Sequence, residues 1–138
     1  MTLAAEKLRE KKLKLTPQRI AIYSALLNTK SHPSAETIYK SIESTHPTMS
    51  LATVYKTLEI LKNHELIQEF NVGEDCFRYD ATYESHPHFV CMVCGMVADL
   101  PSTRLINTNE IRTELSDATD YEIIKEQINF FGKCSACK

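Results

Sequence analysis

Two Cys-x-x-Cys pairs carry the strongest chemical signal in the sequence. Cys91 and Cys94 form the first pair, and Cys134 and Cys137 form the second. Four thiolates in two short turns are typical of a closed tetrahedral site, which Zn²⁺ prefers. A closed site leaves no coordination position open for a substrate, so its predicted role is structural. Disulfides or free buried thiols are the alternatives, and the fifth cysteine, Cys76, is expected to be an ordinary half-buried strand residue.

A second group of candidate ligands lies beside the first cysteine pair. His86 and His88 alternate along the chain, so on a strand they would share one face. Asp80, Asp99 and His32 are the further candidates, and imidazoles with carboxylates form a harder ligand set that suits Fe²⁺ or Mn²⁺, with Zn²⁺ as a competitor. These residues come from three separated segments. Spacing alone therefore leaves open the alternative that they are ordinary surface or core residues.

The distribution of charge differs between the two halves of the chain. Residues 1–62 hold ten basic and five acidic side chains, whereas the remainder holds six basic and 13 acidic ones. A basic first half predicts an anionic partner for that half only, and a solvated helical surface is the alternative. The sequence shows no secretory signal and no long apolar run, so we expect a cytoplasmic protein that does not span a membrane. A reducing cytoplasm favours metal binding over disulfides at the paired cysteines.

The elements that would position these residues follow from apolar spacing and capping signals. Thr16 before Pro17, Ser34 and Ser50 each predict a helix start, and strands are predicted over 66–72 and 76–80 around a turn at Gly73. Three helices followed by a hairpin predict a winged helix-turn-helix domain.

The domain organisation follows from the same reading. The predicted DNA-binding domain spans residues 1–80, a hinge spans 81–86, and a dimerisation domain spans 87–138. The last part is expected to hold strands near 88–92 and 96–100, a helix near 104–118 and a strand near 121–131. The predicted fold class is therefore α+β, with an N-terminal winged helix followed by a small α/β domain.

The helix predicted from residue 50 to residue 63 is the candidate recognition helix. With its apolar stripe buried, Thr53 and Tyr55 face outward and can contact thymine methyl groups, while Lys56 can meet phosphate or guanine. Ser50, at the helix start, can donate to a phosphate. The alternative is an ordinary amphipathic helix with a mixed polar face.

Six motifs, taken in their order and spacing, resemble the ferric uptake regulator family over nearly the whole chain. They are LKLTPQR (13–19), HPSAETIY (32–39), SLATVYKTLEIL (50–61), FRYD (77–80), HPHFVCMVCG (86–95) and CSAC (134–137). The resemblance implies a homodimeric transcriptional repressor that binds a palindromic DNA operator. It also implies a divalent metal at the hinge that locks the dimer into its DNA-binding shape.

Carried over residue by residue, the resemblance assigns three sets of positions. They are structural zinc at Cys91, Cys94, Cys134 and Cys137; a regulatory metal at His32, Asp80, His86, His88 and Asp99; and DNA contacts at Lys14, Tyr55 and Lys56, with Arg78 added from the wing. Aspartate at both 80 and 99 is similar to the peroxide-sensing branch, which implies metal-catalysed oxidation of His32 and His86. An extra metal site of many iron sensors is expected to be absent, because its ligand positions hold Ser85, Pro87 and Glu126.

Other functions stay open at this point. An iron, zinc or manganese uptake regulator of the same family would share most of these residues. A non-haem iron enzyme is the alternative from another class, although five protein ligands would leave little room for a substrate. A zinc-ribbon interaction module without a regulatory metal is the third reading.

Overall fold

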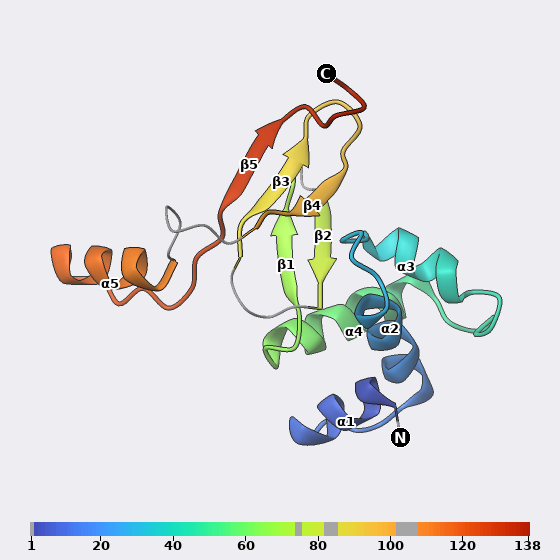
Figure 1. Ribbon diagram of the computed structural model, residues 1–138. Coiled ribbons are helices and arrows are strands. Elements are labelled where there is room, and N and C mark those ends of the chain that lie inside the picture. The colour runs from blue at the N-terminus through green and yellow to red at the C-terminus, as the bar shows by residue number, and fades with distance from the viewer. Residues whose placement is uncertain (1, 74–75, 82–85, 102–107) are drawn as a thin grey trace. The chain divides into compact units, whose positions relative to one another are not determined.

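The computed structural model describes residues 2–73, 76–81, 86–101 and 108–138. The chain divides into two compact units, Met1–Tyr83 and Glu84–Lys138 (Figure 1). The division falls within the predicted hinge 81–86, of which residues 82–85 lie outside the described residues, so the domain boundaries stay a prediction. No helix in the described ranges has the length and apolar character needed to cross a membrane.

The first unit consists of helices followed by a two-stranded sheet. The helices are α1 (Leu3–Glu10), α2 (Pro17–Leu27), α3 (Ala35–Ile42) and α4 (Leu51–Asn63), and the antiparallel strands are β1 (Gln68–Asn71) and β2 (Phe77–Asp80). Figure 1 shows the β1–β2 ribbon extending from the end of α4. The predicted winged helix-turn-helix order is thus observed, whereas residues 74 and 75 of the predicted hairpin turn lie outside the described residues.

Hydroxyl caps set where these helices begin. The side chains of Thr16, Ser34 and Ser50 accept the backbone N–H three residues on, at 3.2, 3.2 and 3.1 Å, and Thr2 does the same for α1. Each bond satisfies one of the backbone donors that a helix start leaves without a partner. The three predicted helix starts are therefore confirmed, including Pro17 in the first turn of α2.

One apolar core joins the four helices to the start of the wing, the pair of strands β1 and β2. Leu8, Leu26 and Leu61, from α1, α2 and α4, are each at most 1% exposed and belong to the same buried cluster as Ile38 and Ile67. Each such side chain contributes about 1.5–3 kcal/mol through burial. This core fixes α3 and α4 against each other, and it therefore determines how α4 presents its outer face.

The second unit is built on a three-stranded sheet with the order β4-β3-β5. β3 (His88–Cys91) pairs with β4 (Val97–Asp99) antiparallel and with β5 (Asn129–Gly132) parallel. The helix α5 (Thr108–Ala118) matches the described part of the predicted helix, whose residues 104–107 lie outside the described residues. None of the side chains of α5 is buried within this chain.

The prediction of a strand from 121 to 131 was wrong for residues 121–128. Only Asn129–Gly132 forms β5, and its register pairs it with all four residues of β3. Residues 121–128 are mostly exposed. A strand needs a hydrogen-bonding neighbour, and the pairing with β3 begins only where His88 N–H donates to the Ile128 carbonyl at 3.0 Å.

Candidate metal centres and nucleic-acid interface

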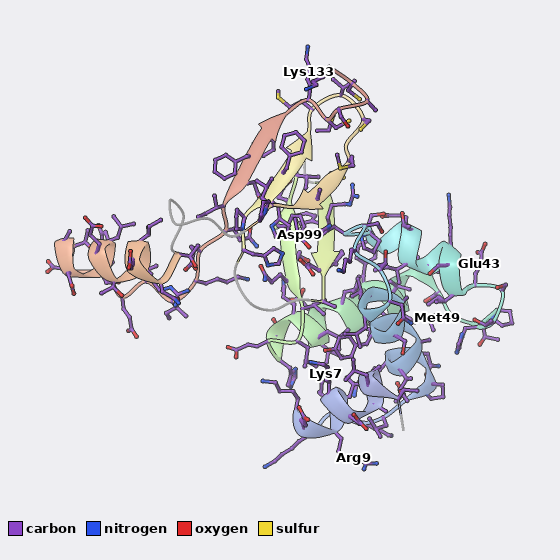
Figure 2. All side chains as sticks on the ribbon, viewed as in Figure 1. Lys7, Arg9, Glu43, Met49, Asp99 and Lys133 are labelled. Atoms are coloured by element: carbon purple, nitrogen blue, oxygen red, sulfur yellow. The ribbon has the colours of Figure 1, made fainter. Side chains whose placement is uncertain are left out.

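The two cysteine pairs lie at the same end of the second sheet. Cys91 ends β3 and Gly132 ends β5, and the parallel register places these two residues opposite each other. A tight turn follows each strand: Gly95 N–H donates to the Cys91 carbonyl at 3.0 Å, and Cys137 N–H donates to the Cys134 carbonyl at 3.0 Å. Gly95 has a φ of +77°, a conformation that glycine adopts without steric cost. Figure 2 labels Lys133, the residue before Cys134, at this end of the sheet.

The four sulfur atoms have the spacing of a metal site. All four lie within 4.8 Å of one another, and Cys94 Sγ is 3.8 Å from Cys134 Sγ. A disulfide would need about 2.05 Å, so the disulfide alternative does not fit. A tetrahedron with Zn–S bonds of about 2.3 Å has edges of about 3.8 Å, which matches the observed separation.

Backbone donors already favour negative charge at this cluster. The N–H groups of Cys94 and Cys134 point at Cys91 Sγ from 3.5 and 3.4 Å. These donors lower the pKa of the Cys91 thiol to about 6. The pKa of Cys137 is raised to about 12, chiefly by its hydrogen bond with the adjacent Cys134 sulfur and then by desolvation. A divalent cation would favour the ionised form of all four thiols.

In the first unit, His32 and Asp80 form a pair of candidate ligands. His32 Nε2 lies 3.2 Å from Asp80 Oδ2, and the exposed fractions of these two residues are 2% and 9%. The edge of the His32 ring packs against Phe70 of β1, with ring centroids 5.8 Å apart. Asp80 ends β2, so the wing supplies one partner and the segment before α3 supplies the other.

The backbone at His32 is held in an unusual conformation. His32 has a φ of +55°, which is uncommon for a residue that is not glycine. Arg78 donates through Nε to the His32 carbonyl and through Nη2 to the Ser31 carbonyl at 3.2 Å. Tyr79 N–H donates to the Pro33 carbonyl at 3.0 Å. The strand β2 therefore fixes this segment from both sides of the histidine.

In the second unit, His86, His88 and Asp99 form a trio. Asp99 Oδ1 lies 2.7 Å from His86 Nε2 and 3.3 Å from His88 Nε2, and the two imidazole centroids are 4.4 Å apart. The antiparallel register places His88 directly opposite Asp99, which Figure 2 labels. The trio therefore offers two imidazole nitrogens and a carboxylate at metal-ligand spacing.

The candidate DNA contacts all lie in the first unit. Lys14, Tyr55 and Lys56 are exposed. Tyr55 donates its hydroxyl to Glu36 Oε1 at 2.5 Å. The Ser50 hydroxyl is engaged in capping α4 and lies 3.0 Å from Thr53 Oγ1.

Two roles at these sites were missed by sequence reasoning. The guanidinium of Arg78 donates to the Ser31 and His32 carbonyls, a structural role that was not predicted. The predicted contact of Arg78 with DNA stays a prediction. Glu36 was not predicted to have a role, although it accepts a hydrogen bond from the hydroxyl of Tyr55 in α4. No local pattern signals either contact, because the partners are 46 and 19 residues apart.

An extra metal site of many iron sensors was predicted to be absent from this chain, on the basis of three residues. Pro87 has no ligand atom in its side chain. Glu126 binds Arg112 through both carboxylate oxygens, at 2.7 and 2.8 Å. Ser85 lies outside the described residues. The absence of the extra site stays a prediction.

Comparisons with known proteins agree in one family. The model of the ferric uptake regulator family matches residues 10–131. The transcriptional regulator PerR of Clostridium acetobutylicum is 59% identical over 130 residues, which cover 94% of this chain and 92% of that protein. The peroxide-responsive repressor PerR of Staphylococcus aureus is 30% identical over 131 residues, covering 95% and 86%. The crystal structure of the Campylobacter jejuni peroxide stress regulator aligns with a TM-score of 0.76 at 31% identity, over 99% of this chain and 100% of that one.

The fold is that of a winged-helix protein with a second, sheet-containing unit that carries a four-cysteine site. The chain belongs to the ferric uptake regulator family. The predicted family and fold class are thereby confirmed. Because the relatives are transcriptional regulators, the enzyme reading is set aside in favour of a regulator.

Proposed function

We propose that this chain is a metal-dependent homodimeric repressor in the cytoplasm that binds a palindromic operator and senses hydrogen peroxide. The observation that carries the proposal is the division of hard ligands between the two units. The first unit holds the His32–Asp80 pair and the second holds the trio of His86, His88 and Asp99. Relatives named as peroxide-responsive repressors support the same reading.

The four cysteines hold a structural Zn²⁺ in this proposal. The 3.8 Å sulfur separation and the N–H groups directed at Cys91 support that assignment. The zinc site fastens β5 beside β3, and His88 opens β3. The structural metal thereby stabilises the strand from which one regulatory ligand projects.

The regulatory metal is Fe²⁺ or Mn²⁺, bound by the pair and the trio together. Nitrogen and oxygen ligands of this kind suit both ions, and Zn²⁺ competes for them. An ion that takes ligands from both units would hold them in one arrangement. That arrangement would therefore become more populated as the metal concentration rises. Coupling of this sort changes the affinity for a second ligand by roughly 5–150-fold, and here the second ligand is DNA.

Peroxide acts on the histidine ligands. Fe²⁺ bound there would supply the redox chemistry that activates hydrogen peroxide. One peroxide oxygen would be inserted into a ring C–H bond of His32 or His86, which keeps its hydrogen, and the other oxygen would leave as water with both peroxide hydrogens. An oxidised imidazole is a poorer ligand, so the two ligand groups no longer share an ion and repression is lifted.

The DNA-binding face lies on the first unit. Each protomer of the dimer inserts α4 into the major groove, so the two-fold symmetry of the protein matches an inverted repeat. Thr53, Tyr55 and Lys56 meet base edges and phosphates, Ser50 meets a phosphate at the start of α4, and Lys14 adds a backbone or groove contact.

The test compares oxidation in two metal forms of the same protein. Zinc-replete protein is loaded anaerobically with Fe²⁺ or Mn²⁺ and treated with low hydrogen peroxide, and its peptides are analysed by mass spectrometry. We expect one added oxygen on peptides containing His32 or His86 in the iron form only, together with loss of DNA binding. His46 and His64, which lie outside the ligand groups, serve as internal controls. An iron form that keeps unmodified histidines and binds DNA would instead support a metal-uptake regulator.

A further inference from the structure

A hydrogen bond between two helices controls the chemistry of the candidate recognition tyrosine. Tyr55 lies in the second turn of α4 and is 44% exposed, so its ring can reach a groove. Its hydroxyl donates to Glu36 Oε1 at 2.5 Å, and Glu36 lies in the first turn of α3. The one hydroxyl proton of Tyr55 is thereby committed to a protein partner.

The proton stays on the tyrosine and the charge stays on the glutamate. The hydrogen bond from Tyr55 is the largest cause that lowers the pKa of Glu36, and the same bond raises the pKa of Tyr55. Glu36 is further favoured as an anion by its own backbone N–H and by Ser34, at the positive end of α3. The groove beside the pair has no lysine or arginine among the described residues that line it.

A tyrosine hydroxyl whose one proton is already donated in a hydrogen bond can only accept further hydrogen bonds. In the major groove, adenine and cytosine each present an amino group that can donate a hydrogen bond. Guanine and thymine present only hydrogen-bond acceptors there. We propose that Glu36 is a specificity-determining residue that turns Tyr55 into a hydrogen-bond acceptor. Through it, α4 selects a base that bears an exocyclic amino group at one position of each half-site. The inference rests on the proposed function, because it requires α4 to enter the major groove.

Charge gives the pair a second, separable effect. The Glu36 carboxylate is exposed on the side of α3 that faces Tyr55. Its negative charge therefore repels the DNA phosphates whatever the base sequence. Replacing Glu36 by alanine should therefore raise the non-specific affinity for DNA, because the negative charge is lost. It should also lower the discrimination between bases at one position, because the hydrogen bond is lost. A contribution to discrimination of roughly two- to tenfold is expected from one hydrogen bond between neutral groups.

The experiment uses the full-length protein with zinc and Mn²⁺, and a duplex that the wild type selects from a random library. Every base pair of one half-site is replaced in turn, and competition binding is measured for wild type, Tyr55→Phe, Glu36→Ala, which has no side-chain acceptor, and the double variant. We expect one position where wild type prefers adenine or cytosine by roughly two- to tenfold. Either single change should remove this preference, and Glu36→Ala should change it no further in the Tyr55→Phe background.

Two further variants separate geometry from charge. Glu36→Asp keeps the charge but shortens the side chain, so it should also lose the preference. Glu43→Gln removes a charge at the other end of α3, where Figure 2 labels Glu43, and should leave the preference unchanged. An unchanged preference in Glu36→Ala, or an equal effect of that change with and without the Tyr55 hydroxyl, overturns the inference. If no duplex is selected at all, the proposed function falls and the inference falls with it.

Discussion

Replacing Arg78 by alanine should weaken the regulatory metal site although Arg78 is not among its proposed ligands. Its guanidinium holds the carbonyls of Ser31 and His32, and His32 has a φ of +55°. Without these bonds the segment can relax toward a more favourable backbone conformation, and the imidazole moves away from Asp80. Metal binding must then restore the original conformation at its own cost.

The magnitude follows from the two hydrogen bonds. A bond to a charged donor contributes about 1.5–3 kcal/mol when buried, and less when solvent competes for it. The bond to Ser31 is exposed and counts for little, so the bond to His32 dominates. We therefore expect a cost of about 1.5–2.5 kcal/mol, or a dissociation constant raised roughly 10- to 60-fold.

Competition between the protein and a metal-sensitive chelator dye measures this effect without DNA. Zinc-replete wild type, Arg78→Ala and Arg78→Lys are titrated with Mn²⁺, which avoids oxidation during the assay. Lysine keeps the charge with a single donor group, so an intermediate affinity is expected. Lys56→Ala is the matched control, since it removes a predicted DNA contact that lies outside this segment. A dissociation constant for Arg78→Ala within twofold of wild type would refute the reasoning.

Three further outcomes can be checked with standard assays. Cys134→Ser should lose the tightly bound zinc and lower the thermal midpoint, and retention of stoichiometric zinc in elemental analysis would contradict the structural site. Tyr55→Ala should weaken operator binding more than non-specific binding, whereas Lys14→Ala should weaken both in competition assays at fixed salt. Burial raises the pKa of Tyr23 from 10.0 to about 12, so this phenol ionises first in the unfolded chain. Stability should therefore fall between pH 10 and 12, and Tyr23→Phe should reduce that fall in denaturant titrations.

Local signals explain which parts of the fold were predictable. Thr16, Ser34 and Ser50 cap helices through bonds that span three residues, so the sequence around each cap suffices to place it. The strand predicted from residue 121 failed for a non-local reason. Its length is set by pairing with β3, and that pairing begins only at the bond from His88 N–H to the Ile128 carbonyl.

The same distinction applies to the sites. Each cysteine pair is local, because two residues of turn bring its thiols together. The meeting of the two pairs depends on the parallel pairing of β3 with β5, which no motif encodes. The clamp of Arg78 on His32 and the bond of Tyr55 to Glu36 are also non-local, and polar residues at such positions have no characteristic spacing.

The parallel pairing of β3 with β5 also has a consequence for biosynthesis. His88 and its neighbours emerge from the ribosome earlier than Asn129–Gly132, which complete the sheet beside them and are made after the other described strands. Cys134 and Cys137 follow later still. A nascent chain therefore cannot close its zinc site until residues 134–137 have left the ribosome. Cells short of zinc should accumulate immature regulator that responds poorly to iron or peroxide, which would make zinc supply a checkpoint on newly made sensor.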